Sequence, residues 1–300
     1  DSDDLEKKIT EKSKVLIIQH TFGKPADLKS LIAIAKKHNL KIIEDCAHSF
    51  GAKQDGKLLG TFGDIGMFSF GSDKILSCVR GGGLITNDDE ISKKLQEFQS
   101  RLPLARKLKV IQHLFHYIAF AKGKPLYNLG VGKWILGTSK KLNLMNRVIY
   151  NPEKHGKQVI FYPSLLPNSL ATILLKQFKT FDSINKHRQE VAKLYDQQIT
   201  NSKIIKPDVS DESVWLRYTL LVENPTKLHV IAKKQGIILG NWYNQAIAPR
   251  DVELGKSGYK VGSCPNADKL SNQSINLPTN RHITKRDAEK IIAIINRYGN

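Results

Sequence analysis

The chain has 300 residues, of which 40% are hydrophobic, so it can bury one large core or two modest ones. It carries 47 Lys and Arg against 28 Asp and Glu, and the resulting net charge of +19 would suit nucleic acid, an anionic membrane or a phosphorylated substrate. The sequence contains no helix-turn-helix, RRM or zinc-finger pattern and no aromatic stacking platform, so we expect no nucleic-acid partner. A solvated, lysine-rich surface is the simplest explanation of the charge.

The cysteines give no sign of covalent or metal cross-links. Cys46, Cys78 and Cys264 are widely spaced and odd in number, which indicates neither a disulfide framework nor a zinc site. We therefore expect no bound metal, and a reducing, cytoplasmic location fits this composition.

The first predicted elements form a strand, a helix and a second strand. Residues 15–23 (VLIIQHTFG) predict a strand that ends in a turn. Asp27 stands where an N-cap belongs, before apolar residues at helical spacing over residues 28–40. The run IIEDCA, residues 42–47, predicts the next strand. This βαβ pattern favours an α/β fold whose parallel sheet is covered on both faces.

Two strand ends in the next segment carry reactive side chains. The apolar run that reaches Asp45 and the run over residues 65–70, which contains Ser69, both predict buried strands, and Lys74 follows closely. Ligands of open α/β sheets bind outside the carboxyl ends of the strands. An acid and a lysine at that edge suit pyridoxal phosphate (PLP), whose aldehyde a lysine holds and whose pyridinium nitrogen an acid pairs. Taken alone, these residues leave open that Asp45 is a helix cap and Lys74 a surface lysine.

The same segment resembles a known family. The run IIEDCAHSFGAKQDGKLLGTFGDIGMFSF, then Lys74 and the triple glycine 81–83, is similar to the signature of the DegT/StrS family of PLP-dependent nucleotide-sugar aminotransferases. Residues 177–195 and 263–284 resemble further family segments. The resemblance implies the aspartate-aminotransferase fold, PLP-dependent fold type I, with a mostly parallel sheet in a large domain and a smaller α+β C-terminal domain.

The resemblance also implies a role for each polar residue of this segment. Lys74 would hold the cofactor and move the reacting proton, and Asp45 would keep the pyridine nitrogen protonated. His48 would lie beside the ring and its phenolic oxygen, and Ser69 would bind the phosphate. A core histidine and an ordinary strand-end hydroxyl remain the alternatives for these last two residues.

The expected reaction is transamination of a keto sugar linked to a nucleotide, with glutamate as the expected amino donor, for glycan or amino-sugar biosynthesis. A PLP-dependent sugar dehydratase of the same family is an alternative, but such relatives replace the lysine with histidine, whereas Lys74 is present. A non-catalytic, membrane-associated relative is another. The four retained site residues argue against it.

Two departures from the family pattern concern the partner subunit and the N-terminus. The resemblance implies a homodimer, yet an Asn-Tyr-Arg motif that reaches the partner's cofactor is replaced by FYPSLLPNSL at 161–170, where Asn168 is a weak substitute. The family also places several αβ units ahead of the equivalent of Val15, including a phosphate-binding turn and a stacking aromatic. We therefore expect residues 1–100 to be the C-terminal part of the PLP-binding large domain, and this piece alone to aggregate or to bind PLP weakly, without measurable activity.

Residues 101–160 form a basic segment with unusual composition. They hold twelve Lys and Arg and one acid, Glu153, around the apolar and aromatic stretch 110–137. Lysines and a proline interrupt the apolar runs, so none is long enough to span a bilayer. Such a pattern is typical of a helix that lies on an anionic membrane, giving a cytoplasmic or membrane-peripheral protein. An ordinary helical hairpin packed on the protein or on a dimer mate is the alternative.

Residues 161–300 predict the small C-terminal domain. We expect one long amphipathic helix over 170–199, strands over 214–224 and 237–243, a helix over 225–236, and a final helix after Thr284 as N-cap.

The substrate-facing candidates in this domain are Arg217, Trp242 and Tyr243. Arg217, expected inside a strand, would bind a carboxylate or phosphate, or else form a buried ion pair. Trp242 and Tyr243 would stack on a sugar or base, or else belong to the core.

Overall fold

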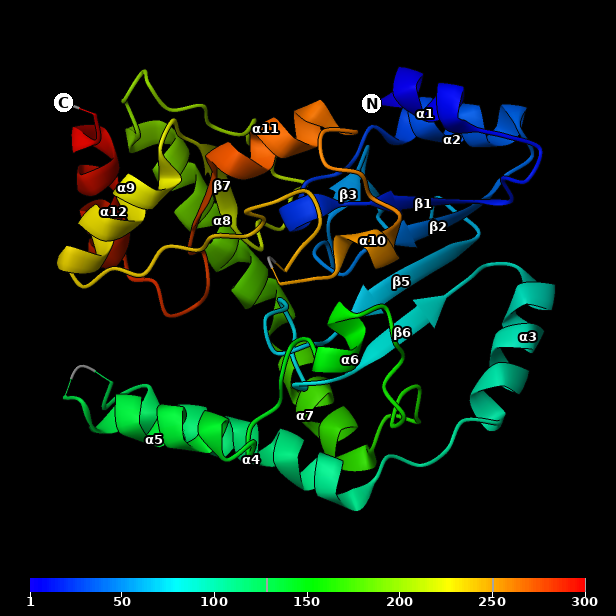
Figure 1. The fold of residues 1–300 in the computed structure, drawn as a ribbon, viewed down its shortest axis with the longest axis horizontal. Helices are drawn as coiled ribbons and strands as arrows, with labels where there is room; N and C mark the ends of the chain where they lie inside the picture. Colours follow the sequence, from blue (N-terminus) through cyan, green and yellow to red (C-terminus); the bar gives the residue numbers. More distant parts are fainter. Residues whose placement is uncertain (128, 250, 300) are drawn as a thin grey trace.

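The computed structural model describes residues 1–127, 129–249 and 251–299 (Figure 1). A mixed sheet with its helices forms one half of the molecule, and an α+β unit that contains the C-terminus lies beside it. A helical hairpin runs along the lower left of Figure 1, below the C-terminal unit. The three-part division at residues 100 and 160 stays a proposal.

The central sheet has four strands in the order β1-β2-β5-β6. Strands β1 (Val15–Gln19), β2 (Lys41–Asp45) and β5 (Ile65–Ser69) are parallel, whereas β6 (Gly82–Ile85) is antiparallel to β5. The predicted α/β fold with a mostly parallel sheet is therefore confirmed. A small ladder of β3 (Lys53–Gln54) and β4 (Lys57–Leu58) lies between β2 and β5 in the chain.

Helix α2 (Leu28–Lys37) connects β1 to β2 as predicted. The Asp27 side chain accepts a hydrogen bond from the Ser30 N–H and so satisfies one of the free amides of the first turn. Leu28 is 1% exposed and packs in a core with Ile18 and Ile42 of the two strands. The short helix α1 (Ser2–Lys8) contacts α2.

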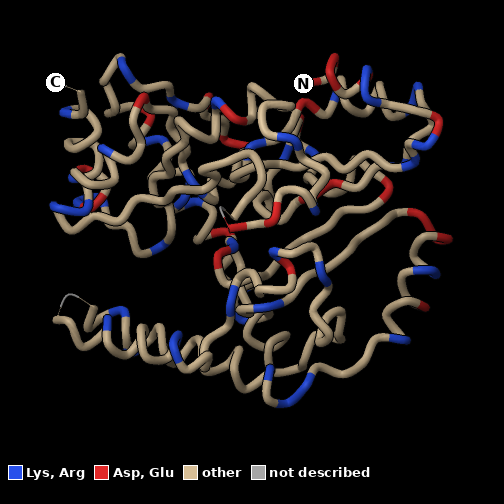
Figure 2. Tube along the Cα trace, viewed as in Figure 1, with Lys and Arg blue, Asp and Glu red and all other residues tan. Residues whose placement is uncertain are grey.

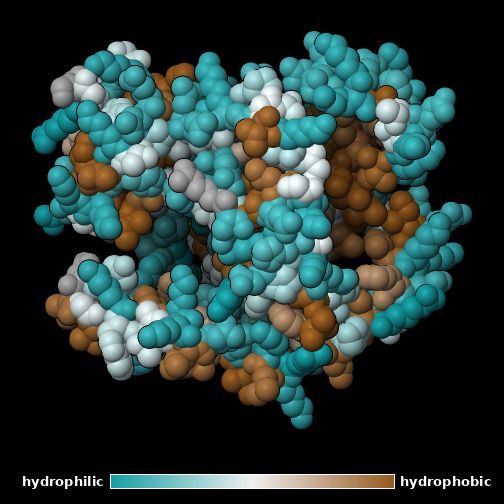
Figure 3. All heavy atoms as spheres, viewed as in Figure 1, coloured by the Kyte–Doolittle hydropathy of each residue, from teal (hydrophilic) through white to brown (hydrophobic). Residues whose placement is uncertain are grey.

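The sheet leaves apolar side chains uncovered. Strand β1 is an edge strand, and Ile17 on it is 65% exposed. At the other edge, Leu84 and Ile85 of β6 and Phe98 of α3 (Asp89–Ser100) are also exposed. Figure 3 shows the brown hollow that lies between the sheet and α3.

The single long helix predicted over 170–199 is wrong, because the structure contains two helices there. Helix α7 (Asn168–Phe178) ends and α8 (Phe181–Gln198) begins around Thr180, whose φ of −115° and ψ of 10° interrupt the helix. Phe178 and Phe181 on the two sides of the break pack edge-on against Phe50, with ring centroids 5.4 and 5.2 Å away. Helix α7 and the start of α8 thereby close the core of the sheet.

The C-terminal unit has its own core. Strands β7 (Tyr218–Leu221) and β8 (Ser274–Leu277) pair antiparallel, and α8, α9 (Pro225–Lys234) and α12 (Lys285–Arg297) contribute side chains to the same buried cluster. The predicted N-cap Thr284 accepts from the Asp287 N–H. Helices α10 (Leu254–Ser257) and α11 (Pro265–Gln273) lie between α9 and β8 in the chain.

Two strand predictions in this unit need correction. Strand β7 covers only four residues of the expected 214–224, because Trp215 has a φ of 47° that no strand accommodates. The segment 237–243 forms no strand but a single antiparallel bridge, between Gly240 and Asn276. Arg217 therefore lies immediately before a strand, not inside one.

The basic segment forms a hairpin of α4 (Lys107–Gly123) and α5 (Val131–Lys141), followed by the short α6 (Asn151–Lys154). Asn128, in the connection between α4 and α5, lies outside the described residues. No helix in the described part of the chain combines the length and apolar character needed to cross a bilayer.

Candidate active site

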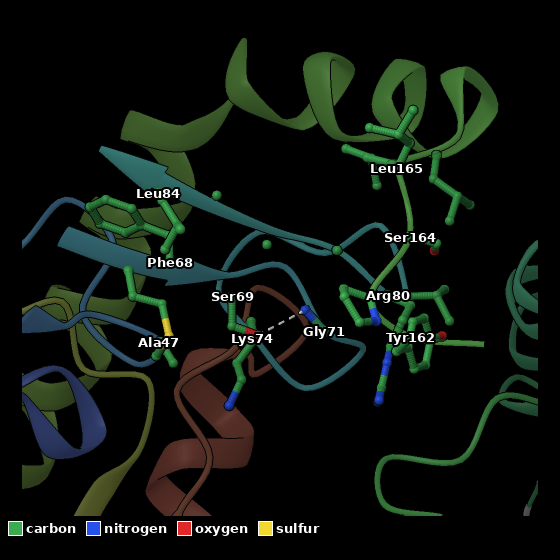
Figure 4. A pocket seen from close by; sticks show the side chains of 18 of the residues that line it. Ala47, Phe68, Ser69, Gly71, Lys74, Arg80, Leu84, Tyr162, Ser164 and Leu165 are labelled. Atoms are coloured by element: carbon green, nitrogen blue, oxygen red, sulfur yellow. Dashed lines mark hydrogen bonds between the residues drawn. The ribbon is translucent and has the colours of Figure 1, made fainter. Parts of the chain in front are cut away.

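The ends of β2 and β5 bring the predicted residues to one edge of the sheet. Asp45 is the last residue of β2 and Ser69 the last of β5, and the two strands are neighbours in register from Ile43 to Asp45. The Cys46 N–H donates to the Met67 carbonyl at 2.8 Å, which continues this pairing past the end of β2. Lys74 follows in the turn after β5 (Figure 4).

The Asp45 carboxylate is oriented from two sides. The Gln19 side-chain amide, opposite it on β1, donates to one carboxylate oxygen at 3.3 Å, and the Ala47 N–H donates to the other at 3.0 Å. Thr21 in turn donates to the Gln19 side-chain oxygen. The contact with the Ala47 N–H is one that a local cap also makes. The Gln19 amide, which comes from β1, in addition orients the carboxylate toward the edge of the sheet.

Glu44, the neighbour of Asp45, is completely buried, and this residue was not predicted to matter. One of its oxygens accepts from the Phe62 and Gly63 N–H groups at 2.6 and 2.7 Å, and the other from the Gly60 N–H at 2.9 Å and the His20 ring at 3.2 Å. Burial raises the pKa of Glu44, but these hydrogen bonds outweigh it and leave the pKa below its usual value. Glu44 thus attaches the 60–63 turn to the end of β2.

The buried trio His20, Glu44 and Cys46 has the residue types of a metal site, with all three candidate ligand atoms within 4.8 Å of one another. The hydrogen bonds give a different reading. His20 accepts the Ala26 N–H at Nδ1, so its Nε2 carries the proton that faces Glu44, and neither nitrogen has a free lone pair. We assign this trio a structural role.

His48 lies between two aromatic rings. It stacks on Phe22 with centroids 5.7 Å apart and on Tyr243 with centroids 6.3 Å apart. Its Nδ1 accepts the Phe22 N–H at 3.2 Å, so the ring proton must be on Nε2. Burial, together with the positive charges of Lys74 and Arg217, lowers the pKa of His48 to about 4. His48 is therefore a neutral donor at physiological pH.

Lys74 lies in a tight polar turn. Its ammonium is 3.4 Å from an Asp73 carboxylate oxygen, and only 14% of the Lys74 side chain is exposed. The Gly71 N–H of the same turn donates to Ser69 Oγ at 3.4 Å (Figure 4). A β-carbon on Gly71 would lie within 3.4 to 3.7 Å of Asp73, Ser69 and Lys74, so these groups surround one small volume. Asp73 was not predicted, although it directly precedes the lysine.

The three substrate-facing candidates lie together on the C-terminal side of the site. The Arg217 guanidinium is 5.7 Å from the centre of the Trp242 ring and is also adjacent to Gly240. The Trp242 N–H donates to the Asn276 side chain at 2.8 Å, which anchors this segment to β8. Burial, together with the negative charges of Asp45 and Asp73, raises the pKa of Tyr243. The charges of Asp45 and Asp73 therefore act on Tyr243, which connects these three candidates to the ends of β2 and β5.

A cavity of about 1040 Å³ opens beside the lysine. Ser69, Asp73, Lys74 and Trp242 are among the residues that line it. Arg80 and residues 162–167, the segment that replaces the Asn-Tyr-Arg motif, also line the cavity, and Figure 4 shows Arg80 beside Tyr162. Asn168 itself begins α7 with an exposed side chain.

The fold is the one found in solved sugar aminotransferases, and the family comparison gives the class of the protein. The chain matches the model of the DegT/DnrJ/EryC1/StrS aminotransferase family over residues 1–114 and 140–296. It belongs to that family, as its sequence predicted, and is an enzyme of the sugar aminotransferase type.

Individual relatives agree with this assignment. The chain is 27% identical over 297 residues to the dTDP-3-amino-3,6-dideoxy-alpha-D-galactopyranose transaminase of Aneurinibacillus thermoaerophilus, covering 98% of this chain and 68% of the relative. It is 42% identical over 98 residues to the GDP-perosamine synthase of Escherichia coli O157:H7, covering 33% and 27% of the two chains. Spr1654 of Streptococcus pneumoniae has the same fold, with a TM-score of 0.69 at 19% identity over 99% of this chain and 71% of its own.

Proposed function

We propose that this protein transfers an amino group to the ketone of a nucleotide-linked sugar, with PLP as cofactor and glutamate as amino donor. The observation that carries the proposal is the meeting of Asp45, His48 and Lys74 at the ends of two adjacent strands. The product class follows from the relatives, two of which act on or make sugars linked to dTDP or GDP.

The residues at this edge fit PLP at the ring end. A pyridine ring with a phenolic oxygen and an aldehyde needs a carboxylate, a hydrogen-bond donor and a lysine around it. Here Asp45 is a carboxylate fixed from two sides, His48 is neutral with no acceptor for its Nε2–H among the described residues, and Lys74 has low exposure. Spr1654, which shares the fold, is known in a PLP form. When bound, the cofactor supplies an electron sink at the substrate carbon.

At the phosphate end, the described residues offer fewer groups. Ser69 is the hydroxyl that we assign to the phosphate, and it already accepts a long hydrogen bond from Gly71. A phosphate oxygen would receive the hydroxyl proton of Ser69 without breaking that contact, because the hydroxyl both donates and accepts.

We assign Lys74 the proton transfer at the reacting carbon. Lys74 lines the cavity, and its ammonium is 3.4 Å from the Asp73 carboxylate, an acceptor that holds the side chain near the turn. A flexible four-carbon stem with one end fixed by the turn allows the amine to move between neighbouring atoms. General acid–base catalysis of this kind contributes roughly 10²- to 10⁴-fold.

We assign His48 the orientation of the phenolic oxygen of the cofactor. Because Nδ1 is engaged by the Phe22 N–H, the only proton of the ring is on Nε2 and is available to donate. The low pKa of His48, about 4, means that this donor stays uncharged and its tautomer fixed across the working pH range.

We assign Arg217 the binding of a carboxylate or phosphate of the substrates. No ion pair of Arg217 with a carboxylate is found among the described residues. Its positive charge nevertheless favours the neutral form of His48 and the ionised form of Tyr243. Burial lowers the pKa of Arg217, yet an arginine keeps its charge in the range where enzymes work. Trp242 and Tyr243 beside it would cover a sugar or base.

We also propose that the enzyme works in the cytoplasm as a homodimer, with peripheral membrane contact through residues 101–160. Support for a reducing compartment comes from the three cysteines, all of which are free thiols. The support for the dimer is the resemblance alone.

The proposal is tested by Lys74→Ala, with Lys53→Ala as control because Lys53 is an exposed lysine on β3. Measured in a preparation in which the unsubstituted enzyme is active, amino transfer from glutamate to a panel of nucleotide-linked keto sugars should fall at least about 10³-fold in the first variant and stay unchanged in the second. An equal rate in both variants would contradict the assignment of Lys74. A product that has lost oxygen but gained no nitrogen would favour the dehydratase.

A further inference from the structure

The α4–α5 hairpin is a self-supporting projection. Its two helices approach closely at glycines: a β-carbon on Gly132 would lie 2.0 Å from the Gly123 carbonyl oxygen, and one on Gly123 would lie 2.6 Å from Leu136. The Gly132 N–H also donates to the Leu126 carbonyl. The inner face of the hairpin is therefore closed by its own contacts, and the outer side chains are not required to hold the two helices together.

Several large apolar side chains are exposed in the distal part of this hairpin, which we define as residues 118–142. Leu129 is 75% exposed, Trp134 70%, Leu142 63%, Ile118 56% and Val131 51%. Single exposed apolar residues are ordinary, but five of this size within one short projection form a patch of the kind that marks an interaction surface.

The charged residues of the whole α4–α5 hairpin are all positive. Residues 107–141 contain seven lysines and no Asp or Glu. Figure 2 shows blue and no red along these two helices. Lys122, Lys124, Lys133, Lys140 and Lys141 are exposed, and within the described residues no ion pair joins any of them to a carboxylate.

The shared chemistry of the family does not account for this surface. The family model matches residues 1–114 and 140–296, so residues 115–139, most of the distal part, fall in its gap. None of the residues at the ends of β2 and β5 is in this gap, and Asp45, Ser69 and Lys74 lie in the matched part. A segment outside the common pattern that exposes both apolar and cationic groups points to a function other than amino transfer.

We propose that the distal part of the α4–α5 hairpin binds the surface of an anionic lipid membrane. Its aliphatic and indole side chains would enter the region between headgroups and acyl chains, while its lysines would contact the lipid phosphates. Lys133 is an example of a lysine that lies beside an aromatic ring in this segment, because its ammonium is 5.4 Å from the centre of the Tyr127 ring.

The charge distribution favours lipid over other occupants. A second copy of the chain docked symmetrically on this surface would bring lysines against lysines, with no carboxylate on the distal part to pair them. Nucleic acid would satisfy the lysines but not the exposed aliphatic residues, which have no base edge or stacked ring to contact. An anionic bilayer satisfies both kinds of group.

The test is co-sedimentation of the full chain with vesicles of phosphatidylcholine alone or mixed with phosphatidylglycerol. We expect binding to the anionic vesicles only, and release when salt shortens the screening length from about 10 Å at 0.1 M to about 3 Å at 1 M. The triple variant Lys122→Gln, Lys124→Gln, Lys133→Gln should lose at least about tenfold in vesicle affinity. The matched control is Lys227→Gln, Lys233→Gln, Lys234→Gln on α9, which removes the same charge from a remote surface and should bind normally.

Tryptophan fluorescence gives a second, independent readout. Of the three tryptophans, Trp134 is 70% exposed, Trp215 is 3% exposed and Trp242 is half-buried at the candidate active site, so the part of a blue shift that is lost in a Trp134 variant reports on the hairpin. Most of the shift on adding anionic vesicles should be lost in Trp134→Phe. Equal binding to both kinds of vesicle, no binding to either, or equal losses in the two triple variants would overturn the proposal. A hairpin variant that dissociates a dimer without vesicles would assign the surface to a second copy instead.

Discussion

In the turns after β2 and β5, polar side chains are paired with backbone groups, whereas the lysines along the described part of the α4–α5 hairpin form no ion pair with a carboxylate. Glu44 receives four hydrogen bonds while completely buried, and Asp45 is fixed from two sides. The distal part of the hairpin instead exposes five lysines and several apolar residues to its surroundings. The comparison shows that the strand edge satisfies its polar groups internally, whereas the hairpin does not. The strand edge is organised in advance to hold a small group, whereas the hairpin exposes its apolar and cationic side chains to the surroundings.

The family comparison follows the same division. The strand edge lies in the matched residues, while most of the distal hairpin falls in the gap at 115–139. Substitutions at the edge should therefore change chemistry or folding, and changes in the hairpin should leave both intact.

Asp45→Asn should have the largest effect on the rate among variants that still bind cofactor. An amide cannot keep the pyridine nitrogen protonated, so we expect amino transfer to fall about 10²-fold or more, with the fold unchanged by circular dichroism. Asp89→Asn, in the exposed first turn of α3, is the control. Undiminished turnover would show that Asp45 is only the cap suggested by its bond to Ala47.

Glu44→Gln should have the largest effect on stability. The new amide would direct an NH₂ group at N–H donors from residues 60–63 or at the His20 ring, so we expect a loss of about 3 kcal/mol in the free energy of unfolding. Urea unfolding measures it, with the exposed Glu90→Gln as control. A loss below about 1 kcal/mol would mean that the turn is held by its other contacts.

The pH dependence of that loss has a defined sign. The pKa of Glu44 is lowered in the folded state, so its contribution is fully present above the normal carboxyl pKa of about 4.5 and disappears as the pH falls through the lower folded value. The stability difference between wild type and Glu44→Gln should accordingly shrink in acid and be constant from pH 6 to 8. A difference that grows in acid would contradict this assignment.

Excision of the hairpin should have the smallest effect on catalysis and folding. Because Gly123 and Leu136 are in contact, a short Gly/Ser linker can replace residues 123–136. We expect less than about 1 kcal/mol change in unfolding free energy and an unchanged rate of amino transfer. A rate that falls as far as in Asp45→Asn would erase the contrast between the two regions and assign the hairpin to the active site.

The sequence allowed the strand edge to be predicted because its signals are local. Apolar runs, Asp27 as N-cap and the glycines around Lys74 are readable within a few residues, and the family resemblance supplied the roles. Long-range packing was not readable. The break at Thr180 is packed against Phe50, which is distant in sequence, and Glu44 depends on amides of a turn that lies 16 to 19 residues further along the chain.

The same limit applies to the C-terminal side of the site. Arg217, Trp242 and Tyr243 were predicted as candidates, but Arg217 was expected inside a strand that does not extend so far. Their coupling to the strand edge arises from the packing of Tyr243 against Phe22 and His48, which joins segments more than 190 residues apart. A pattern within one segment cannot reveal such a contact.

The central claim is that Lys74 holds the cofactor, and lysine mapping tests it most directly. The full chain would be incubated with PLP, reduced with borohydride and digested, and the lysine that carries the pyridoxyl group located by mass spectrometry. The account predicts that the label is on Lys74 and is lost in Lys74→Ala while the Lys53→Ala control retains it. Labelling spread over surface lysines, or concentrated on another lysine, would contradict it.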